Sequence, residues 1–336
     1  MTETVSVILP VRNEKKYISA CLDSILNQDY PMDKLEIAVV DGMSEDGTRN
    51  ILNDYAKRYA NMKIIDNPDK IAPTAFNLGI KNATGDVMAI VSAHSELSKD
   101  YISSCIRYLK KTNAENVGGP MRAVGHDYIS NAIAFAYNSP FGLGGGKFHD
   151  ENFEGYVDTV YPGCWPKQVF EKVGLFDEML VRNQDIAFNS RIRSCGGKIF
   201  LTPMIKSQYY CRSNLKDLWV QSFRTGLWNI KTVKIVPGSL SIRHFVPLIF
   251  VLSLLTAWLI LPLWFLIISC YLLCTIYFAL KTAAKHGLRF LLIMPIVFIA
   301  IHVSYGIGLL VGIFNPLCRN SRTCPPKAGE ARGAPL

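Results

Sequence analysis

Two long stretches without a charged side chain dominate the C-terminal third of this sequence. Residues 245–280 and 290–318 contain no Asp, Glu, Lys or Arg. The hydrocarbon core of a bilayer is about 30 Å thick, and a helix needs roughly 20 apolar residues to cross it. The first stretch is longer than one ordinary span and has Pro262 near its middle. We therefore expect a tight hairpin of two helices that turns near Pro262, with one long tilted or kinked helix as the alternative.

Basic residues flank these apolar stretches. The formal net charge is +9, and one basic cluster lies shortly before residue 245: Lys206, Arg212, Lys216, Arg224, Lys231, Lys234 and Arg243. Basic residues beside a membrane segment mark its cytoplasmic flank and attract anionic lipid headgroups. The cluster adjoins an apolar run and no nucleic-acid motif accompanies it, so we expect a membrane surface as its partner and no nucleic acid.

The same charge rule predicts the topology. Lys281, Lys285 and Arg289 follow the first apolar stretch, so both flanks of a hairpin would be cytoplasmic. A third crossing over 290–312 would place the tail outside. Because that tail is itself basic, a re-entrant hairpin, or two spans with an internal tail, are the alternatives. The sequence thus predicts a multi-pass protein of the inner, cytoplasmic membrane.

The rest of the chain has the composition of a soluble α/β domain. We expect a cytoplasmic domain over residues 1–230, a basic linker over 231–244, about three transmembrane helices over 245–314 and a polar, disordered tail over 315–336. The first residues lack the basic and apolar regions of a signal peptide. The nine cysteines include no CxxC pair, which favours ordinary reduced thiols over a disulfide or zinc framework.

Short apolar runs alternate with helical patterns along the first hundred residues. This order predicts a mostly parallel sheet with helices on both faces. In such sheets, ligands bind at the carboxyl ends of the strands. Three polar clusters fall at those ends: Pro10–Glu14, Asp41–Gly47 and Ser92–His94. The sequence therefore predicts a binding site built from three strand ends.

Three motifs resemble those of the inverting family 2 glycosyltransferases, and the likeness covers roughly residues 4–230. They are Val7–Glu14, Val40–Thr48, and Val173–Asp177 followed by Asp185. Segments 139–148 and 155–177 are most similar to the exopolysaccharide branch of that family. The resemblance implies a GT-A fold, a Rossmann-like nucleotide-sugar-binding domain, and a hexosyltransferase activity.

The resemblance assigns the first two clusters to the donor. Pro10, Arg12, Asn13 and Glu14 would line the first strand end, and Asp41 would accept hydrogen bonds from the base or the ribose. Ser44 and Asp46 would shape the second turn. Two simpler interpretations remain open from the residues alone: Asn13 can serve only as a helix N-cap, and Asp46 can merely cap the helix that follows.

The third cluster departs from the family pattern. The family usually has Asp-x-Asp here, and its last acid holds Mg²⁺ or Mn²⁺ on the diphosphate. This chain has Ser92-Ala93-His94. Ser92 can hydrogen-bond a ribose hydroxyl, and His94 is the candidate metal ligand, although imidazole suits Mn²⁺ less well than a carboxylate does. A divalent metal cofactor is therefore doubtful on the sequence alone.

Asp185 is the candidate catalytic base, because an inverting displacement needs a carboxylate that takes the proton of the acceptor hydroxyl. An acid that merely stabilises a helix N-terminus is the alternative. Gln221, Arg224 and Trp228 fall on one helical face that can contact the diphosphate or the acceptor sugar. That helix can equally lie at a membrane surface. The glycine-rich segment 139–147 is interpreted as a mobile substrate loop.

Together these expectations describe one enzyme. It would move a single hexose from a nucleotide sugar, such as a UDP-sugar, to a polyprenyl-linked glycan, among membrane lipids and other polysaccharide-assembly proteins. Two alternatives remain at this stage. One is transfer to polyprenyl phosphate itself, and the other is a non-catalytic membrane scaffold with a degenerate nucleotide pocket.

Overall fold

The computed structural model describes residues 3–160 and 162–315. Their contacts divide them into two compact units. Unit 1 comprises residues up to 122 together with 150–209, and unit 2 comprises residues 123–149 together with those from 210 onward. The predicted disordered tail, apart from Asn315, lies outside the described residues.

An eight-stranded sheet forms the centre of unit 1, in the order β3-β2-β1-β4-β9-β6-β10-β8. The first four strands in that order are all parallel, and so is the β6–β10 pair, whereas β9 and β8 run antiparallel to their neighbours. The expected α/β architecture is confirmed. The strands are β1 (Val5–Val11), β2 (Leu35–Asp41), β3 (Met62–Asp66), β4 (Val87–Ile90), β6 (Asn116–Gly118), β8 (Gly155–Tyr156), β9 (Gly163–Pro166) and β10 (Ile199–Leu201).

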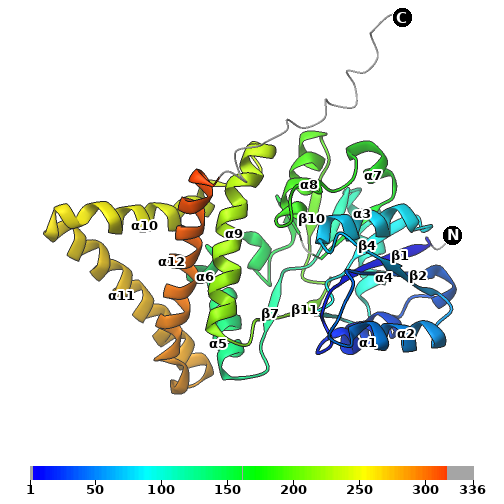
Figure 1. Cartoon of the computed structure of the whole chain (residues 1–336), viewed down its shortest axis with the longest axis horizontal. Coiled ribbons are helices and arrows are strands. Elements are labelled where there is room, and N and C mark those ends of the chain that lie inside the picture. The colour runs from blue at the N-terminus through cyan, green and yellow to red at the C-terminus, as the bar shows by residue number, and fades with distance from the viewer. Residues whose placement is uncertain (1–2, 161, 316–336) are drawn as a thin grey trace, which may run out of the picture. The chain divides into compact units, whose positions relative to one another are not determined.

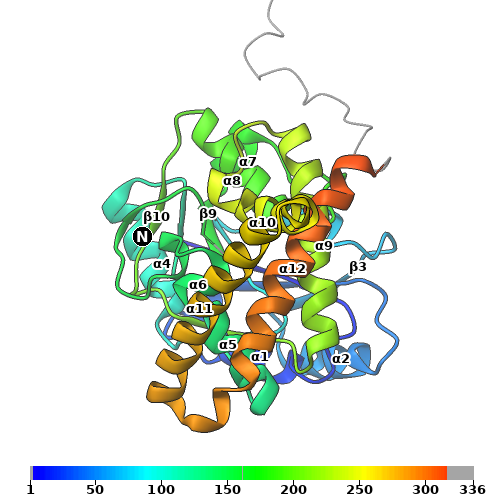
Figure 2. The same cartoon turned by 90° about the vertical axis from the view of Figure 1, so that its left-hand side faces the viewer.

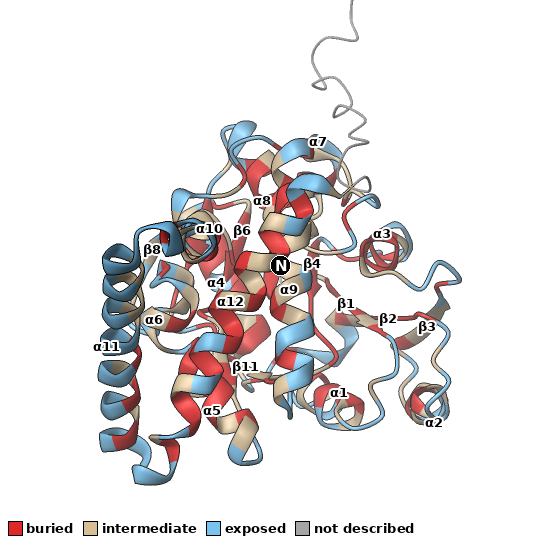
Figure 3. Cartoon of the chain, turned by 60° about the vertical axis from the view of Figure 1, so that its left-hand side comes forward, coloured by how far each residue is buried: buried red, intermediate tan, exposed pale blue. Residues whose placement is uncertain are grey.

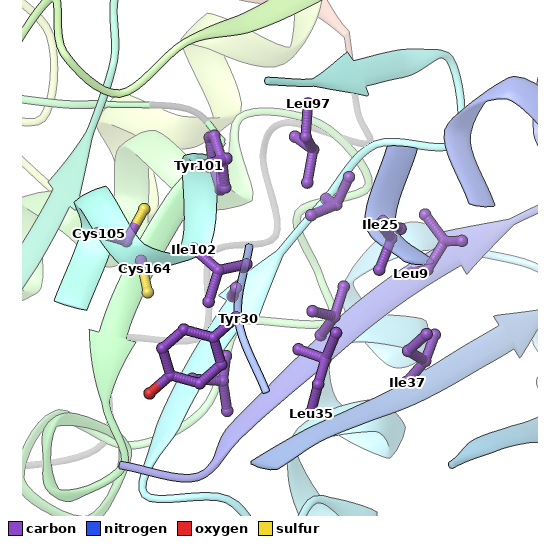
Figure 4. Packing of buried hydrophobic residues seen from close by; sticks show 14 of the residues in the cluster. Leu9, Ile25, Tyr30, Leu35, Ile37, Leu97, Tyr101, Ile102, Cys105 and Cys164 are labelled. Atoms are coloured by element: carbon purple, nitrogen blue, oxygen red, sulfur yellow. The ribbon is translucent and has the colours of Figure 1, made fainter. Parts of the chain in front are cut away.

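Alternating side chains of β1 build the core on both faces of this sheet. Val5, Val7 and Leu9 belong to one large apolar cluster with residues of α1 and α4 (Figure 4). Ile8 points to the opposite face, where it lies against Gly79 of α3. This is the two-residue period of a strand that is buried on both sides. Helices therefore cover both faces, as the sequence predicts.

The helices of unit 1 alternate with its strands along the first hundred residues, as the sequence predicts. They are α1 (Ile18–Leu26), α2 (Thr48–Arg58), α3 (Ala72–Asn82), α4 (Tyr101–Thr112), α7 (Gln168–Val173) and α8 (Gln184–Ser194), with a 3-10 turn η1 (Met32–Lys34). Three short strands, β5 (Ser95–Leu97), β7 (Arg122–Val124) and β11 (Ser207–Tyr210), complete the strand set of the described chain. Of these, β5 pairs antiparallel with β11.

Unit 2 is helical. Its helices are α5 (Tyr128–Tyr137), α6 (Pro140–Leu143), α9 (Leu215–Ile235), α10 (Val246–Thr256), α11 (Leu261–His286) and α12 (Ile293–Phe314) (Figure 1). The 3-10 turns are η2 (Lys147–His149), η3 (Ile242–Phe245), η4 (Ala257–Leu259) and η5 (Leu288–Phe290). Helix α9 continues without a break through the boundary that we predicted at residue 230, so the predicted domain limits remain an interpretation.

The long apolar stretch folds as a hairpin and not as one kinked helix. Helix α10 ends at Thr256, and α11 begins at Leu261 with Pro262 in its first turn. Proline is favoured there because the first turn of a helix has no backbone acceptor for its missing N–H. The described chain then has three helical segments long and apolar enough to cross a membrane: 242–259, 261–286 and 293–314.

The glycine-rich segment begins with a fixed part. Residues 140–143 form the single turn α6, and the ring of Phe141 stacks on Phe278 of α11 with centroids 5.1 Å apart. Phe141 also meets the rings of Phe298 and His302 of α12 edge-on. The start of this segment is thereby held by an aromatic cluster, while the mobility expected for the rest stays a prediction.

Candidate active site

The three predicted polar clusters lie at the carboxyl ends of three adjacent strands. Strand β1 is paired in parallel with β2 on one side and with β4 on the other. In this register Pro10 lies opposite Val40, and Val11 lies opposite Asp41. The topology thus brings together segments that are up to about eighty residues apart in the chain.

The first two loops are joined by three consecutive backbone N–H groups. Asn13 N–H donates to Ser44 Oγ (2.9 Å), Glu14 N–H to Thr48 Oγ1 (2.9 Å) and Lys15 N–H to an Asp46 carboxylate oxygen (3.1 Å). These three acceptors are the polar side chains of the second motif. Their first role is therefore to fix the β1 loop against the β2 loop.

The interpretation of Asn13 as a helix N-cap is wrong. Helix α1 begins only at Ile18, and Tyr17 is its N-cap residue. Asn13 instead has a left-handed backbone (φ 56°), and its side-chain oxygen accepts from the backbone N–H of Glu45 (2.9 Å). A left-handed Asn is a common turn residue. Asn13 thus locks the two loops together from both its backbone and its side chain.

Asp46 does cap the start of α2 and has a second partner as well. Its carboxylate accepts from both the N–H and the hydroxyl of Thr48 (3.0 and 2.5 Å). Although partial desolvation opposes the shift, these hydrogen bonds lower the pKa of Asp46. The capping interpretation and the bond to Lys15 therefore hold together.

Asp41 is buried and its carboxylate already has partners. Its side chain is 1% exposed, and it accepts from Ser44 Oγ (2.6 Å) and from the guanidinium of Arg49 (3.0 Å). Arg49 also pairs with Asp66 at the end of β3 (2.5 Å). The sequence reasoning missed Arg49, although its place one residue into α2, directly after the Asp41–Thr48 motif, is a usable signal.

Arg12 fixes the loop that follows β3. Its guanidinium donates to the backbone carbonyl of Lys70 (3.1 Å). A Cβ on Gly42 would lie 3.2 Å from the Arg12 side chain, so the glycine leaves room for this arginine. Three loop segments at one edge of the sheet, those after β1, β2 and β3, are therefore interlocked.

Glu14 and His94 connect the first and third strand ends. His94 Nδ1 lies 3.3 Å from Glu14 Oε1, and Ser92 Oγ lies 3.2 Å from His94 Nε2. The ring of Tyr209 meets that of His94 edge-on at 5.1 Å. Ser92 Oγ is also 3.3 Å from His94 Nδ1, so it is about equally far from both ring nitrogens. A proton on Nδ1 would let His94 donate to the Glu14 carboxylate and would leave Nε2 as the nitrogen with a lone pair.

Glu14 and His94 can offer a divalent metal only one protein ligand, the imidazole of His94. The described residues contain no group of three or more His, Cys, Asp and Glu side chains placed to hold an ion. A histidine whose second nitrogen is oriented by a carboxylate is, however, the usual form of a metal-binding imidazole. Mg²⁺ takes oxygen ligands and completes its shell with substrate phosphates and water. An imidazole nitrogen suits a transition ion better than Mg²⁺, so His94 Nε2 would serve as the protein ligand of an ion such as Mn²⁺.

Asp185 lies in the first turn of α8, two residues after the N-cap residue Asn183, whose backbone is left-handed (φ 60°). Its side chain is only partly exposed, and burial raises the pKa of its carboxyl group. A raised pKa makes a carboxylate a stronger base at neutral pH, as proton abstraction requires. This environment suits a general base, and the role of Asp185 stays a prediction.

Gln221, Arg224 and Trp228 belong to unit 2, where α9 is one continuous helix. Spacings of three and four residues place them along one side of that helix. Arg224 is exposed, and Gln221 Oε1 accepts a hydrogen bond from Arg212 Nε (3.3 Å). The ammonium group of Lys231 lies over the ring of Trp228, 4.8 Å from its centroid. Their contact with diphosphate or acceptor stays a prediction.

A surface hollow of about 330 Å³ lies elsewhere in unit 1. It is lined by residues at the amino ends of β1 and β2, among them Val5, Leu35 and Glu36. Parallel sheets bind ligands at the opposite, carboxyl ends. We therefore assign the site to the interlocked loops and not to this hollow.

Comparison with known proteins identifies the family. The family model described as glycosyl transferase family 2 matches residues 6–165. A relative from Methanococcus voltae is 31% identical over 320 residues, which cover 92% of this chain and 98% of the relative. The chain belongs to glycosyltransferase family 2. The M. voltae relative is named dolichyl N-acetyl-alpha-D-glucosaminyl phosphate 3-beta-D-2,3-diacetamido-2,3-dideoxy-beta-D-glucuronosyltransferase.

Two further proteins are similar to this chain. The succinoglycan biosynthesis protein ExoA of Rhizobium meliloti is 28% identical over 254 residues, covering 74% of this chain and 76% of ExoA. The mannosyltransferase PcManGT from Pyrobaculum calidifontis, solved with GDP-Man and Mn²⁺, superposes with a TM-score of 0.62 at 18% identity over 92% of this chain and 88% of that one. This structural likeness confirms the expected GT-A fold. The chain is thus a glycosyltransferase.

Proposed function

We propose that this family 2 glycosyltransferase moves a single hexose from a nucleotide sugar, with UDP as the expected leaving group, to a lipid-linked glycan, with inversion at the anomeric carbon. The observation that carries the proposal is the set of interlocked polar loops at the ends of β2, β1 and β4. The exposed apolar helices of unit 2 support a lipid-linked acceptor. The product would serve an exopolysaccharide or another cell-envelope polysaccharide.

The relatives favour an acceptor that already carries a sugar. By its name, the M. voltae enzyme acts on a dolichyl phosphate that bears N-acetylglucosamine, and the R. meliloti protein takes part in succinoglycan biosynthesis. Carried over to this chain, these names favour extension of a lipid-linked saccharide over transfer to polyprenyl phosphate itself.

The chain's own residues supply the remaining steps. The loops fixed by Asp41 and Asn13 would receive the base and the ribose of the donor. Asp185 would take the proton of the acceptor hydroxyl while that oxygen attacks the anomeric carbon from the face opposite the diphosphate. A divalent ion held by His94 would neutralise charge on the leaving diphosphate.

A transfer assay on membranes tests this function. Membranes that contain the full chain are incubated with labelled UDP-sugars and with polyprenyl-linked saccharides, and the lipid fraction is analysed by mass. We expect a product heavier by one sugar, attached to the saccharide. A sugar attached directly to the lipid phosphate would support the polyprenyl-phosphate alternative. Donor binding without any transfer, together with full biological function of Asp185→Ala, would support the scaffold alternative.

A further inference from the structure

The three apolar segments of unit 2 differ sharply in burial. Of the most apolar window in each, 17% is buried in 242–259 and 11% in 261–286, but 56% is buried in 293–314. Figure 3 shows the same contrast, with α11 almost wholly exposed and α12 largely buried. All three segments could cross a membrane by length and composition, but the first two are mostly exposed and the third is mostly buried against other helices.

Helix α12 is packed closely inside unit 2. A Cβ on Gly308 would collide with the carbonyl oxygen of Phe223 in α9, and one on Gly312 would lie 2.9 Å from that of Leu227. A Cβ on Gly306 would collide with the carbonyl oxygen of Pro247 at the start of α10. These glycines let the backbones of α12, α9 and α10 touch directly.

Helix α9 runs parallel to α12, since Phe223 lies beside Gly308 and Leu227 beside Gly312. It carries exposed Arg224 and Lys234 as well as the partly buried Lys231. If α12 crossed a bilayer, α9 would be drawn in beside it. By this register Arg224 would lie about 7.5 Å inside the end of α12, at 1.5 Å per residue, while Lys231 and Lys234 would lie at or beyond that end. Placing the charge of Arg224 in hydrocarbon is costly, so this pair of helices is unsuited to span.

The α10–α11 hairpin has the opposite character. Between Phe245 and Leu280 it has no charged residue, and its tip exposes a continuous apolar surface: Leu255, Trp258, Leu259, Ile260, Leu261 and Leu263. A fully spanning hairpin would bring this tip into water on the far side. The hairpin leaves the rest of unit 2 as a projecting pair of helices in Figure 1, and Figure 2 shows α10 nearly end-on.

The first helical segment of the hairpin, 242–259, is also short for a membrane span. The 18 residues of 242–259 reach about 27 Å at 1.5 Å per residue, and part of that segment is the polar turn around Arg243. The hydrocarbon core is about 30 Å thick. Basic residues flank the start of α10 and the end of α11, where they can contact anionic headgroups. They are Arg243, His244, Lys281, Lys285 and Arg289.

We propose that, within the described chain, only the α10–α11 hairpin enters the bilayer, from one face and back to it with its tip in the hydrocarbon, while α12 lies with α9 at the membrane surface. The partner of the exposed hairpin is thus a lipid bilayer with anionic headgroups. The third crossing that the sequence predicts does not occur, and Asn315 stays on the side of the 287–292 loop. This inference does not depend on the proposed reaction.

Single-cysteine labelling of the full chain in sealed vesicles tests this topology. Leu288→Cys, Asn315→Cys and Leu259→Cys are compared with the parent chain, in a background where the exposed Cys195, Cys270 and Cys274, and also Cys318 and Cys324, are replaced by Ser. With an impermeant maleimide, we expect Leu288→Cys and Asn315→Cys to react from the same side, and Leu259→Cys to react only after detergent. Reaction of Asn315→Cys from the opposite side would restore the third span, and reaction of Leu259→Cys from the far side would show a fully spanning hairpin.

A matched pair of charge variants gives an independent readout. Leu266→Lys with Leu273→Lys alters the exposed face of α11, and Leu292→Lys with Ile296→Lys alters exposed positions at the start of α12; all four side chains are at least 50% exposed. We expect the α11 pair to lower the membrane-bound fraction after a salt wash by at least about tenfold, because two lysines would enter hydrocarbon. The α12 pair should leave that fraction within about twofold, since its lysines remain at the headgroup layer. Equal loss for both pairs would overturn the proposal.

Discussion

The loops of unit 1 and the hairpin of unit 2 place polar and apolar groups in opposite ways. At the strand ends, Asp41 is buried and its carboxylate is held by Ser44 and Arg49. In α11, large side chains such as Leu273 are 67% exposed. Burying a charge is costly unless it is paired, and exposing apolar surface to water is costly unless another phase covers it. The contrast teaches that unit 1 is organised for a polar ligand and unit 2 for lipid.

The largest expected effect compares two acids in the first turns of helices, Asp185 in unit 1 and Asp217 in unit 2. We expect Asp185→Asn in α8 to lower the rate of transfer by about 10²–10⁴-fold with donor affinity nearly unchanged, because the proton acceptor is lost. In the parent enzyme, activity should fall as the pH drops through the raised pKa of Asp185, since the base is then protonated.

Asp217→Asn is the matched control, since Asp217 occupies the first turn of α9. Both variants lose the same helix-dipole interaction, but only one removes the proposed base. Initial rates and donor titrations on both variants separate the two roles. Near-normal turnover of Asp185→Asn, or equal losses in the two variants, would contradict the assignment.

The next effect sharpens what the buried carboxylate does. We expect Asp41→Ala to weaken donor binding by about 10–100-fold, because Arg49 loses a buried partner and the loop loses its anchor. Asp66→Ala removes the other, exposed partner of Arg49 and should change donor affinity less than threefold. Isothermal titration with UDP measures both, and equal affinities in Asp41→Ala and the parent chain would place the nucleotide elsewhere.

A third prediction concerns packing in unit 2. Gly308→Ala should destabilise the α9–α12 contact by about 1–3 kcal/mol, because the added methyl group meets the backbone of Phe223. Ile313→Ala on the exposed side of α12 should change stability much less. Thermal unfolding of both variants in the same detergent is the measurement. An unchanged melting temperature for Gly308→Ala would mean that the two helices separate readily.

The smallest effect returns to the third strand end. Ser92→Asp would add a carboxylate beside His94, and we expect donor affinity in the presence of Mn²⁺ to increase on the order of tenfold. The increase should vanish when the metal is chelated. If chelation changes neither donor affinity nor activity of the parent chain, the charge of the diphosphate must be neutralised by basic side chains instead.

The sequence predicted the sheet well because β1 and β2 are mostly apolar, interrupted only by Ser6 and Glu36, with polar residues at their carboxyl ends. It also predicted the helical hairpin, because proline is favoured in the first turn of a helix and Pro262 therefore marks the start of α11. It erred at Asn13, whose N-cap chemistry is equally satisfied by a loop partner. Local pattern does not distinguish a partner three residues away from one thirty-two residues away, such as Glu45.

What the sequence determined by itself is the kind of chain this is: an α/β glycosyltransferase domain with the family's motifs, and apolar helices after it. These follow from periodicity and composition, which act locally. Only the tertiary structure decided that Arg49 holds Asp41, that Glu14 orients His94, and that Gly308 lies against Phe223. Each of these depends on which distant segments become neighbours, and that is settled by packing rather than by any local run of residues.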